Sequence, residues 1–323
     1  MTRVSALAFA GVAVLAIGGC GGQGRTAAAA RTVTVNVHPA TRPTASTTIA
    51  APPKPPPPLF PRLLTGALGT QPTPGFVPAV RWDGHTAAWV ARTTSGVTLL
   101  AFDQHLLELH LHAGTADEGV GWRFGGAVSP GEVRRIAAAF NGGFKFSTDP
   151  GGFQSYGRTA VPLRNGLGSV VTYADGGTDI GSWNREVPAQ GRAVVSVRQN
   201  LPLLIDHGSG PSTIDCLTCW GATLGGVSDP ARSALGITSE GRLVWAGGEH
   251  LTVAALVGAL EGAHVVRAVE LDINPEWVNA YLYGHHAGGH GPPTPVQMVS
   301  GQQGIPGQFL APWSRDFFTI VAR

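Results

Sequence analysis

In Ala138-Ala-Phe-Asn-Gly-Gly-Phe144 an apolar run gives way at Asn141 to a tight glycine turn. The same change occurs in the run from Ala231-Arg-Ser-Ala-Leu-Gly236 to Glu270-Leu-Asp-Ile-Asn274, where Arg232 and Asp272 stand at the ends of apolar segments. A rigid apolar core often carries functional residues at its rim. These stretches therefore predict both a core and the place where chemistry occurs.

Around these stretches, 46 glycines separate short apolar runs, a pattern typical of many strands joined by tight turns. The expected strands are 86–93, 96–102, 106–112, 169–172, 192–197, 235–237, 243–246 and 265–271. One helix is expected from a capping box at Ser129 to about Ala139, and a second from Thr252 to near Gly262. We expect an α+β fold with a long, twisted, mixed sheet and a few flanking helices, the 265–271 strand lying beneath helical cover.

The N-terminal sequence predicts export. Residues 1–19 combine a basic start, a short apolar run and small residues, which is typical of a secretory signal peptide. Cys20 follows Ile17-Gly-Gly as in a lipobox and is the expected lipidation site; the alternative is an ordinary signal with an incidental cysteine. Residues 20–62 are rich in Pro, Thr and Ala and predict a semi-rigid tether. Residues 63–323 have the size of one globular domain.

The net charge and the basic residues of the chain indicate which class of partner it can bind. The 22 basic residues include only two lysines, Lys54 and Lys145, a bias typical of a high-GC genome such as that of an actinobacterium. The net charge is +2, and no basic cluster is long enough to follow a phosphate backbone, so we expect no nucleic-acid partner.

The order of motifs resembles the phosphodiester glycosidase family. The shared elements are the segment ending in Asn-Gly-Gly-Phe, then Arg232 before Ala234-Leu-Gly, a second strand, a helix closing in Gly262-Ala263, and Leu271-Asp272. The segment Leu203-Leu-Ile-Asp-His-Gly208 resembles the apolar-Asp-Gly element of the family. The resemblance covers roughly residues 138–272.

The resemblance implies cleavage of the sugar C1–oxygen bond of a sugar-1-phosphodiester. It assigns catalytic roles to Asp272, Arg232 and Asn141: Asp272 as nucleophile, base or electrostatic partner of an oxocarbenium-like centre, and Arg232 as a phosphate ligand. The implied substrate-binding residues are Gly142, Gly143 and Asp206, and Asn274, Glu276 and Trp277 are expected as sugar contacts in a loop that departs from the family.

The chain departs from the family after Asp272. Where the family continues with a run of glycines and a serine, this chain has Ile273-Asn-Pro-Glu-Trp277, in which the proline removes an amide donor and fixes the backbone. Either the loop has been rebuilt with new sugar contacts, or catalysis has been lost and only glycan binding remains.

Three further groups of residues suggest metal binding, each with an alternative. Cys216 and Cys219 fit half a zinc site or, in an exported protein, a local disulfide, which we favour. Glu108, His110 and His112 share one face of an expected strand and fit either a metal site or a polar outer face, the reading we favour. His285, His286 and His290 fit either a metal site or a mobile loop near the active site, the reading we favour.

We therefore expect an extracytoplasmic glycosidase, lipid-anchored to the outer face of the cytoplasmic membrane, that acts on a sugar-phosphate glycan or cell-wall polysaccharide. The alternative is a non-catalytic glycan-binding or envelope-scaffolding lipoprotein with the same fold. No cofactor is expected and no metal site is assigned, although a divalent cation is compatible with the sequence.

Overall fold

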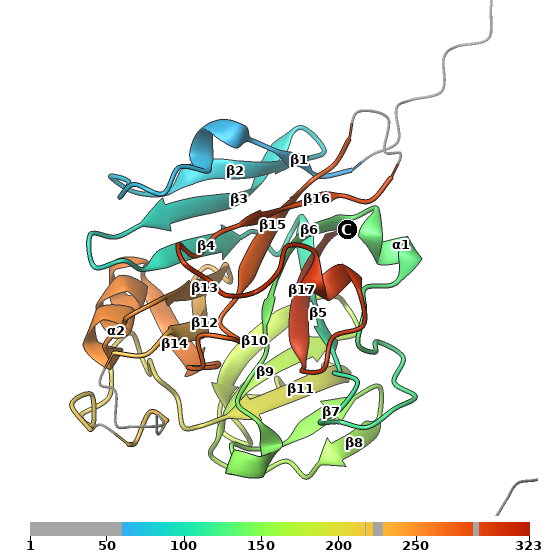
Figure 1. Cartoon of the computed structure of the whole chain (residues 1–323). Helices are drawn as coiled ribbons and strands as arrows, with labels where there is room; N and C mark the ends of the chain where they lie inside the picture. The colour runs from blue at the N-terminus through green and yellow to red at the C-terminus, as the bar shows by residue number, and fades with distance from the viewer. Residues whose placement is uncertain (1–59, 217, 222–228, 287–290) are drawn as a thin grey trace, which may run out of the picture. The chain divides into compact units, whose positions relative to one another are not determined.

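The computed structural model describes residues 60–216, 218–221, 229–286 and 291–323. The predicted signal peptide 1–19, the predicted lipidation site Cys20 and nearly all of the tether 20–62 lie outside these residues. The described part consists mainly of strands, which form three antiparallel sheets (Figure 1). Among these residues, no helix combines the length and the apolar character that a membrane span requires.

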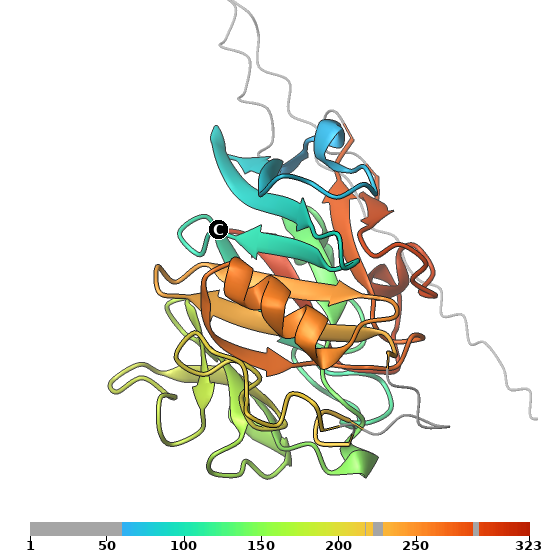
Figure 2. The same cartoon turned by 90° about the vertical axis from the view of Figure 1, so that its left-hand side faces the viewer.

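The first sheet has seven strands and carries a helix on one face. In order across the sheet, the strands are β1 (Arg62–Leu63), β2 (Val77–Trp82), β3 (His85–Arg92), β4 (Thr98–Phe102), β13 (Leu243–Gly248), β12 (Arg232–Thr238) and β14 (Val265–Glu270). Helix α2 (Val253–Gly262) begins after its N-cap Thr252 and packs on β12, β13 and β14, as Figure 2 shows. The predicted second helix, and a buried strand beneath it, are confirmed.

Strands β4, β12 and β13 are covered on both faces, which explains why their sequences are continuously apolar instead of alternating. In β4, Leu100 and Phe102 belong to a core that also includes residues of the third sheet, whereas Leu99 and Ala101 pack in the cluster around α2. The first sheet is therefore the middle layer between helix α2 and the other core.

The other two sheets have five strands each. The second sheet comprises β10 (Thr178–Ser182), β9 (Gly168–Tyr173), β11 (Val194–Asn200), β7 (Phe153–Ser155) and β8 (Arg158–Val161), in that order. The third comprises β16 (Thr294–Gln297), β15 (Ala280–Gly284), β6 (Ile136–Asn141), β17 (Phe317–Ala322) and β5 (Leu107–His112). Short 3-10 turns are η1 (Thr65–Ala67), η2 (Phe146–Thr148) and η3 (Gln308–Leu310). Phe140 of β6 packs against Trp245 of β13 with ring centroids 6.0 Å apart, which joins the first and third sheets.

Strand β6 corrects the predicted first helix. The capping box of Ser129 and Glu132 is present, but helix α1 (Pro130–Val133) ends after a single turn. The chain then enters β6, where Ala138 is paired with Leu282 on one side and Ile320 on the other. Alanine favours helices in isolation, but a site with sheet partners on both sides and complete burial overrides that preference. The Asn-Gly-Gly segment therefore follows a strand.

The predicted fold class is wrong in the proportion of helix to strand and in the number and type of sheets. Strands make up 39% and helices 9% of the structure, so the fold is β-rich and not α+β. Three antiparallel sheets replace the single long mixed sheet. The apolar runs in the sequence suggested that helices cover the buried strands. In the structure, most of that cover comes from other sheets, and helix α2 covers only one face of the first sheet.

Candidate functional site

A pocket of about 420 Å³ lies where segments that leave or enter all three sheets meet. Its walls follow β6, β11 and β14 in the chain and precede β17. The lining residues are Phe144, Lys145, Thr148, Pro150, Leu201, Thr218, Gly221, Asp272, Ile273, Asn274, Trp277 and Arg315. Of the predicted site residues, Asp272, Asn274 and Trp277 line this pocket.

Asp272 follows directly after β14 and is the acidic residue of the pocket. Its Oδ1 atom accepts hydrogen bonds from the amides of Ile273 (2.8 Å) and Asn274 (2.9 Å), so the carboxylate caps the turn that follows. Its Oδ2 atom lies 3.3 Å from Nη2 of Arg315. Burial raises the pKa of Asp272 to about 6, against the opposing effects of the Arg315 charge and the two amide hydrogen bonds. Asp272 therefore changes charge near neutral pH.

Arg315 supplies the buried positive charge of the pocket. It lies just before β17 and is 5% exposed. Besides Asp272, its Nη2 donates to the carbonyl of Gly143 (2.8 Å), and its Nε lies 3.1 Å from Oδ2 of Asp117. Its Nη1 has no hydrogen-bond partner among the described residues. The sequence analysis missed Arg315, because nothing in its local sequence distinguishes it from other arginines.

Asn141 is held behind the pocket and does not line it. Its Nδ2 donates to the hydroxyl of Ser233 (2.9 Å) and to the carbonyl of Gly142 (2.9 Å). The Ser233 hydroxyl in turn donates to the carbonyl of Asp272 and accepts from the amide of Asp272. Asn141 is thus joined to the backbone of Asp272 through Ser233, a residue that the sequence analysis did not single out. Its contacts fit a role in positioning Asp272.

The two glycines after Asn141 are required by close packing. A Cβ atom at Gly142 would lie 2.0 Å from Oδ2 of Asp316, and one at Gly143 would lie 2.7 Å from Cζ of Arg198. Neither glycine has a positive φ, so close packing and not backbone conformation accounts for them. Asp316 and Arg198 form a fully buried ion pair (2.8 Å) beneath this turn. The pair fixes the backbone that presents the Gly143 carbonyl to Arg315.

Arg232 lies outside the pocket and makes a buried ion pair. Its Nη1 is 2.7 Å from Oε1 of Glu270, and it also donates to the carbonyls of Trp220 and Leu251. Arg232 is 3% exposed and Glu270 is fully buried. Burial raises the pKa of Glu270, and the neighbouring Arg232 opposes this shift. These contacts hold Arg232 inside the core, and Arg232 is not among the residues that line the pocket.

An aromatic wall and an exposed lysine complete the pocket. The centroid of the Trp277 ring lies 5.1 Å from Cζ of Arg315 and 5.7 Å from Nζ of Lys145. The amide of Glu276 donates to Oδ1 of Asn274, and the exposed side chain of Glu276 is not among the lining residues. Asp206 lies in a separate turn, where Oδ1 is 2.9 Å from Nδ1 of His207. The structure therefore does not bring Asp206 to the pocket.

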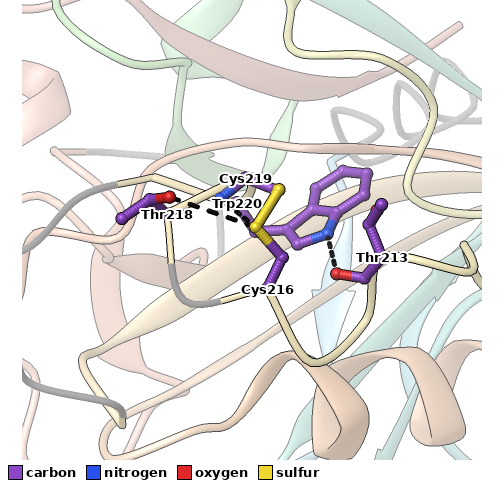
Figure 3. The surroundings of a disulfide bond; sticks show 5 residues. All are labelled: Thr213, Cys216, Thr218, Cys219 and Trp220. Carbon is purple, nitrogen blue, oxygen red and sulfur yellow. Dashed lines mark hydrogen bonds between the residues drawn. A yellow bond between two sulfur atoms is a disulfide. The ribbon is translucent and has the colours of Figure 1, made fainter.

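The predicted Cys216–Cys219 disulfide is present and borders the pocket (Figure 3). Thr218, within the disulfide loop, and Gly221, just after it, both line the pocket. The indole of Trp220 is buried and donates to the carbonyl of Thr213 (3.1 Å). The disulfide thus tethers one wall of the pocket to a buried anchor.

The other candidate metal ligands do not form a metal site in the part of the chain that the structure describes. Among the described residues, no group of three or more His, Cys, Asp or Glu is arranged to hold a metal ion. His110 instead lies between Glu108 (3.2 Å) and Glu132 (2.7 Å). Burial opposes protonation of His110, but hydrogen bonds to both carboxylates outweigh it and raise the pKa of His110 to about 9. His285 binds the carbonyl of Ile136, and position 290 lies outside the described residues.

A larger open groove of about 1050 Å³ lies at hairpin turns on another part of the molecule. Four of its charged side chains form ion pairs, Arg192–Asp175 (2.7 Å) and Arg267–Asp179 (2.9 Å). It offers less for chemistry than the smaller pocket, in which a carboxylate of raised pKa, an arginine and a tryptophan converge.

No protein-family model and no curated protein matches the chain. Among solved structures, the catalytic domain of zebrafish N-acetylglucosamine-1-phosphodiester alpha-N-acetylglucosaminidase, auto-inhibited by its pro-peptide, aligns with a TM-score of 0.43 and 15% identity, over 77% of this chain and 81% of that chain. A hypothetical protein from Synechocystis aligns with a TM-score of 0.41 and 14% identity, over 78% of this chain and 64% of that chain. The similarity is distant and at the level of the fold, and neither alignment assigns this chain to a family or an activity.

Proposed function

We propose that the chain is a glycosidase that hydrolyses the C1–oxygen bond of a sugar-1-phosphodiester in the pocket of Asp272. The observation that carries the proposal is the composition of the pocket lining: one carboxylate, two cationic side chains and a half-buried tryptophan. Carbohydrate rings stack on aromatic faces, cations bind phosphate oxygens, and a carboxylate stabilises positive charge on a sugar.

The presence of a single carboxylate favours a phosphate leaving group. Most glycosidases need two carboxyl groups, one of which protonates the departing oxygen. Here Asp272 is the acidic lining residue, and the undescribed internal segments 217, 222–228 and 287–290 contain no Asp or Glu in their sequence. When the C1–oxygen bond of a sugar-1-phosphodiester breaks, the leaving group is a phosphate monoester anion that is stable without protonation, so the missing general acid costs little.

The contacts of Asp272 favour an electrostatic role. Both carboxylate oxygens are already engaged, one by two backbone amides and the other by Arg315. A carboxylate held this firmly is preorganised to stabilise an oxocarbenium-like transition state, and attack on the sugar would require it to give up these bonds.

The second candidate function is glycan binding without catalysis. The observation that favours it is the burial of Asp272, whose side chain is 6% exposed and caps a turn as a structural aspartate would. On this alternative, the tryptophan and the cations bind an anionic glycan, and Asp272 only holds the loop in place.

Hydrolysis of a panel of α-linked sugar-1-phosphodiesters tests the two functions. Release of reducing sugar is followed for the parent, for Asp272→Asn and for Arg134→Gln, a control that removes an exposed charge outside the pocket. We expect turnover by the parent and the control and none by Asp272→Asn, with its fold shown unchanged by circular dichroism. Binding without turnover by the parent, or full turnover by Asp272→Asn, would contradict the hydrolytic role.

The cellular setting is part of the same proposal. A signal peptide over 1–19, lipidation at Cys20 and the tether 20–62 would place the domain outside the cytoplasmic membrane, next to glycans of the envelope. The disulfide supports an oxidising compartment. Metabolic labelling with a palmitate analogue, compared with Cys20→Ala, measures lipidation directly.

A further inference from the structure

Lys145 is unusual in this chain because lysine is nearly absent from it. The chain has 22 basic residues, of which only Lys54 and Lys145 are lysines, so the described residues contain a single lysine. That lysine follows the Asn-Gly-Gly-Phe turn, is exposed, and lines the pocket of Asp272. A flexible ammonium group at the mouth of the pocket can follow an anion into it.

The charges around the pocket show why a second cation matters. Arg315 lies within 3.3 Å of two carboxylates, Asp117 and Asp272, so its positive charge is more than offset when both are ionised. Among the described residues, by contrast, no Asp or Glu lies within 4.0 Å of the Lys145 ammonium. Without Lys145, the group formed by Arg315 and its two carboxylates carries a net negative charge and repels an anion. With Lys145 the four groups sum to zero.

Arg315 contributes the inner half of an anion site. Its Nη1 is buried and has no hydrogen-bond partner among the described residues, although most buried donors are paired. Both cations approach the same indole, with Arg315 5.1 Å and Lys145 5.7 Å from the ring centroid of Trp277. Arg315, whose Nη1 donor is unused, and Lys145, which has no carboxylate partner among the described residues, therefore lie beside the same indole ring.

We propose that Lys145 and Arg315 form an anion subsite beside Trp277 that binds the phosphoryl group of a glycosyl phosphodiester. The subsite rests on the proposed function for the identity of its ligand. Its ligand class is a phosphodiester monoanion, which suits a site where two carboxylates already offset the charge of Arg315. Lys145 supplies the second positive charge, and Arg315 fixes the position of the phosphoryl oxygens.

Protection of Lys145 from acylation tests the subsite without measuring turnover. The purified full-length protein is treated with an amine-acylating reagent in dimethyl phosphate or in sodium chloride of equal ionic strength. Cleavage at arginine places Lys54 and Lys145 on different peptides, so Lys54 serves as the internal reference. We expect dimethyl phosphate to slow acylation of Lys145 several-fold relative to Lys54, with neutral trimethyl phosphate having no effect. Equal acylation of Lys145 in both salts would overturn the proposal.

Three variants separate the subsite from the hydrolytic activity. Lys145→Gln should raise the KM for a glycosyl phosphodiester about two- to fivefold, the range for a solvent-exposed ion pair. Lys145→Arg keeps the charge and should raise the KM less than Lys145→Gln does. Arg134→Gln, which removes the same charge outside the pocket, should stay close to the parent. A parent-like KM in Lys145→Gln, with turnover intact, would overturn the subsite alone. Protection of Lys145 in a protein that hydrolyses no glycosyl phosphodiester would support the subsite and overturn the hydrolase.

Discussion

Replacing Arg232 with methionine should destabilise the fold instead of simply removing a substrate contact. The change deletes the 2.7 Å ion pair with Glu270 and the hydrogen bonds to the carbonyls of Trp220 and Leu251. Glu270 is fully buried, so the loss of its partner leaves an uncompensated acidic group in the core. Breaking one side of a buried pair costs about 3–5 kcal/mol. That cost is a large part of a total stability of about 5–15 kcal/mol.

Urea unfolding followed by tryptophan fluorescence measures this cost. The matched variants are Glu270→Gln, which removes the charge and keeps the shape, and the double variant Arg232→Met/Glu270→Gln, which removes both charges. We expect the double variant to be more stable than Arg232→Met, because the buried carboxyl group is gone, and the cycle yields their coupling energy. If Arg232→Met keeps the stability of the parent to within about 1 kcal/mol yet loses all turnover, the reasoning is refuted, since a cost that small is typical of positions without a buried network.

The remaining predictions concern the pocket and one charge cluster outside it. The kcat/KM of the parent should rise as the pH increases through about 6, because ionised Asp272 is the active form, and the pH–rate profile of Asp272→Asn should lack this limb. Trp277→Ala should raise the KM about two- to tenfold through loss of sugar stacking, and Trp277→Phe should raise it less; initial rates across substrate concentrations measure both. The stability gained from His110, whose pKa is raised from 6.5 to about 9, is complete below pH 6.5 and is lost as the pH rises through about 9. Thermal unfolding across that window should show a smaller loss in His110→Gln, and an equal loss would contradict the assignment. The double variant Cys216→Ser/Cys219→Ser should raise the KM by loosening the wall that contains Thr218, and a KM equal to the parent's would show that this wall is held without the disulfide.

Local signals in the sequence predicted the elements whose cause is local. Helix α2 was recognisable from its N-cap Thr252 and its apolar spacing, and helix α1 from the capping box at Ser129, because capping depends on residues three positions apart. The Cys216–Cys219 disulfide was predictable for the same reason. The length of α1 was not predictable, because the apolar run that becomes β6 fits a helix and a buried strand equally well.

The pocket was predicted only in part because its partners are distant in the sequence. Asp272 was found from its place after an apolar strand, but Arg315 reaches it from the segment before β17, and no local pattern reports that contact. The partner of Arg232 depends on the register of β12 and β14, which pairs Ala234 with Glu270. Lys145 did carry a signal, its rarity, which the sequence analysis noted as a genomic bias and did not connect to the pocket.

The position of the pocket at the junction of three sheets makes ligand binding a report on the whole domain. Its walls follow β6, β11 and β14 and precede β17, so detachment of any one sheet removes part of the pocket. A ligand bound there stabilises only the fully assembled state. Amide hydrogen exchange should therefore slow on ligand binding in strands of all three sheets, including strands that make no contact with the ligand, because the openings that expose them also dismantle the pocket.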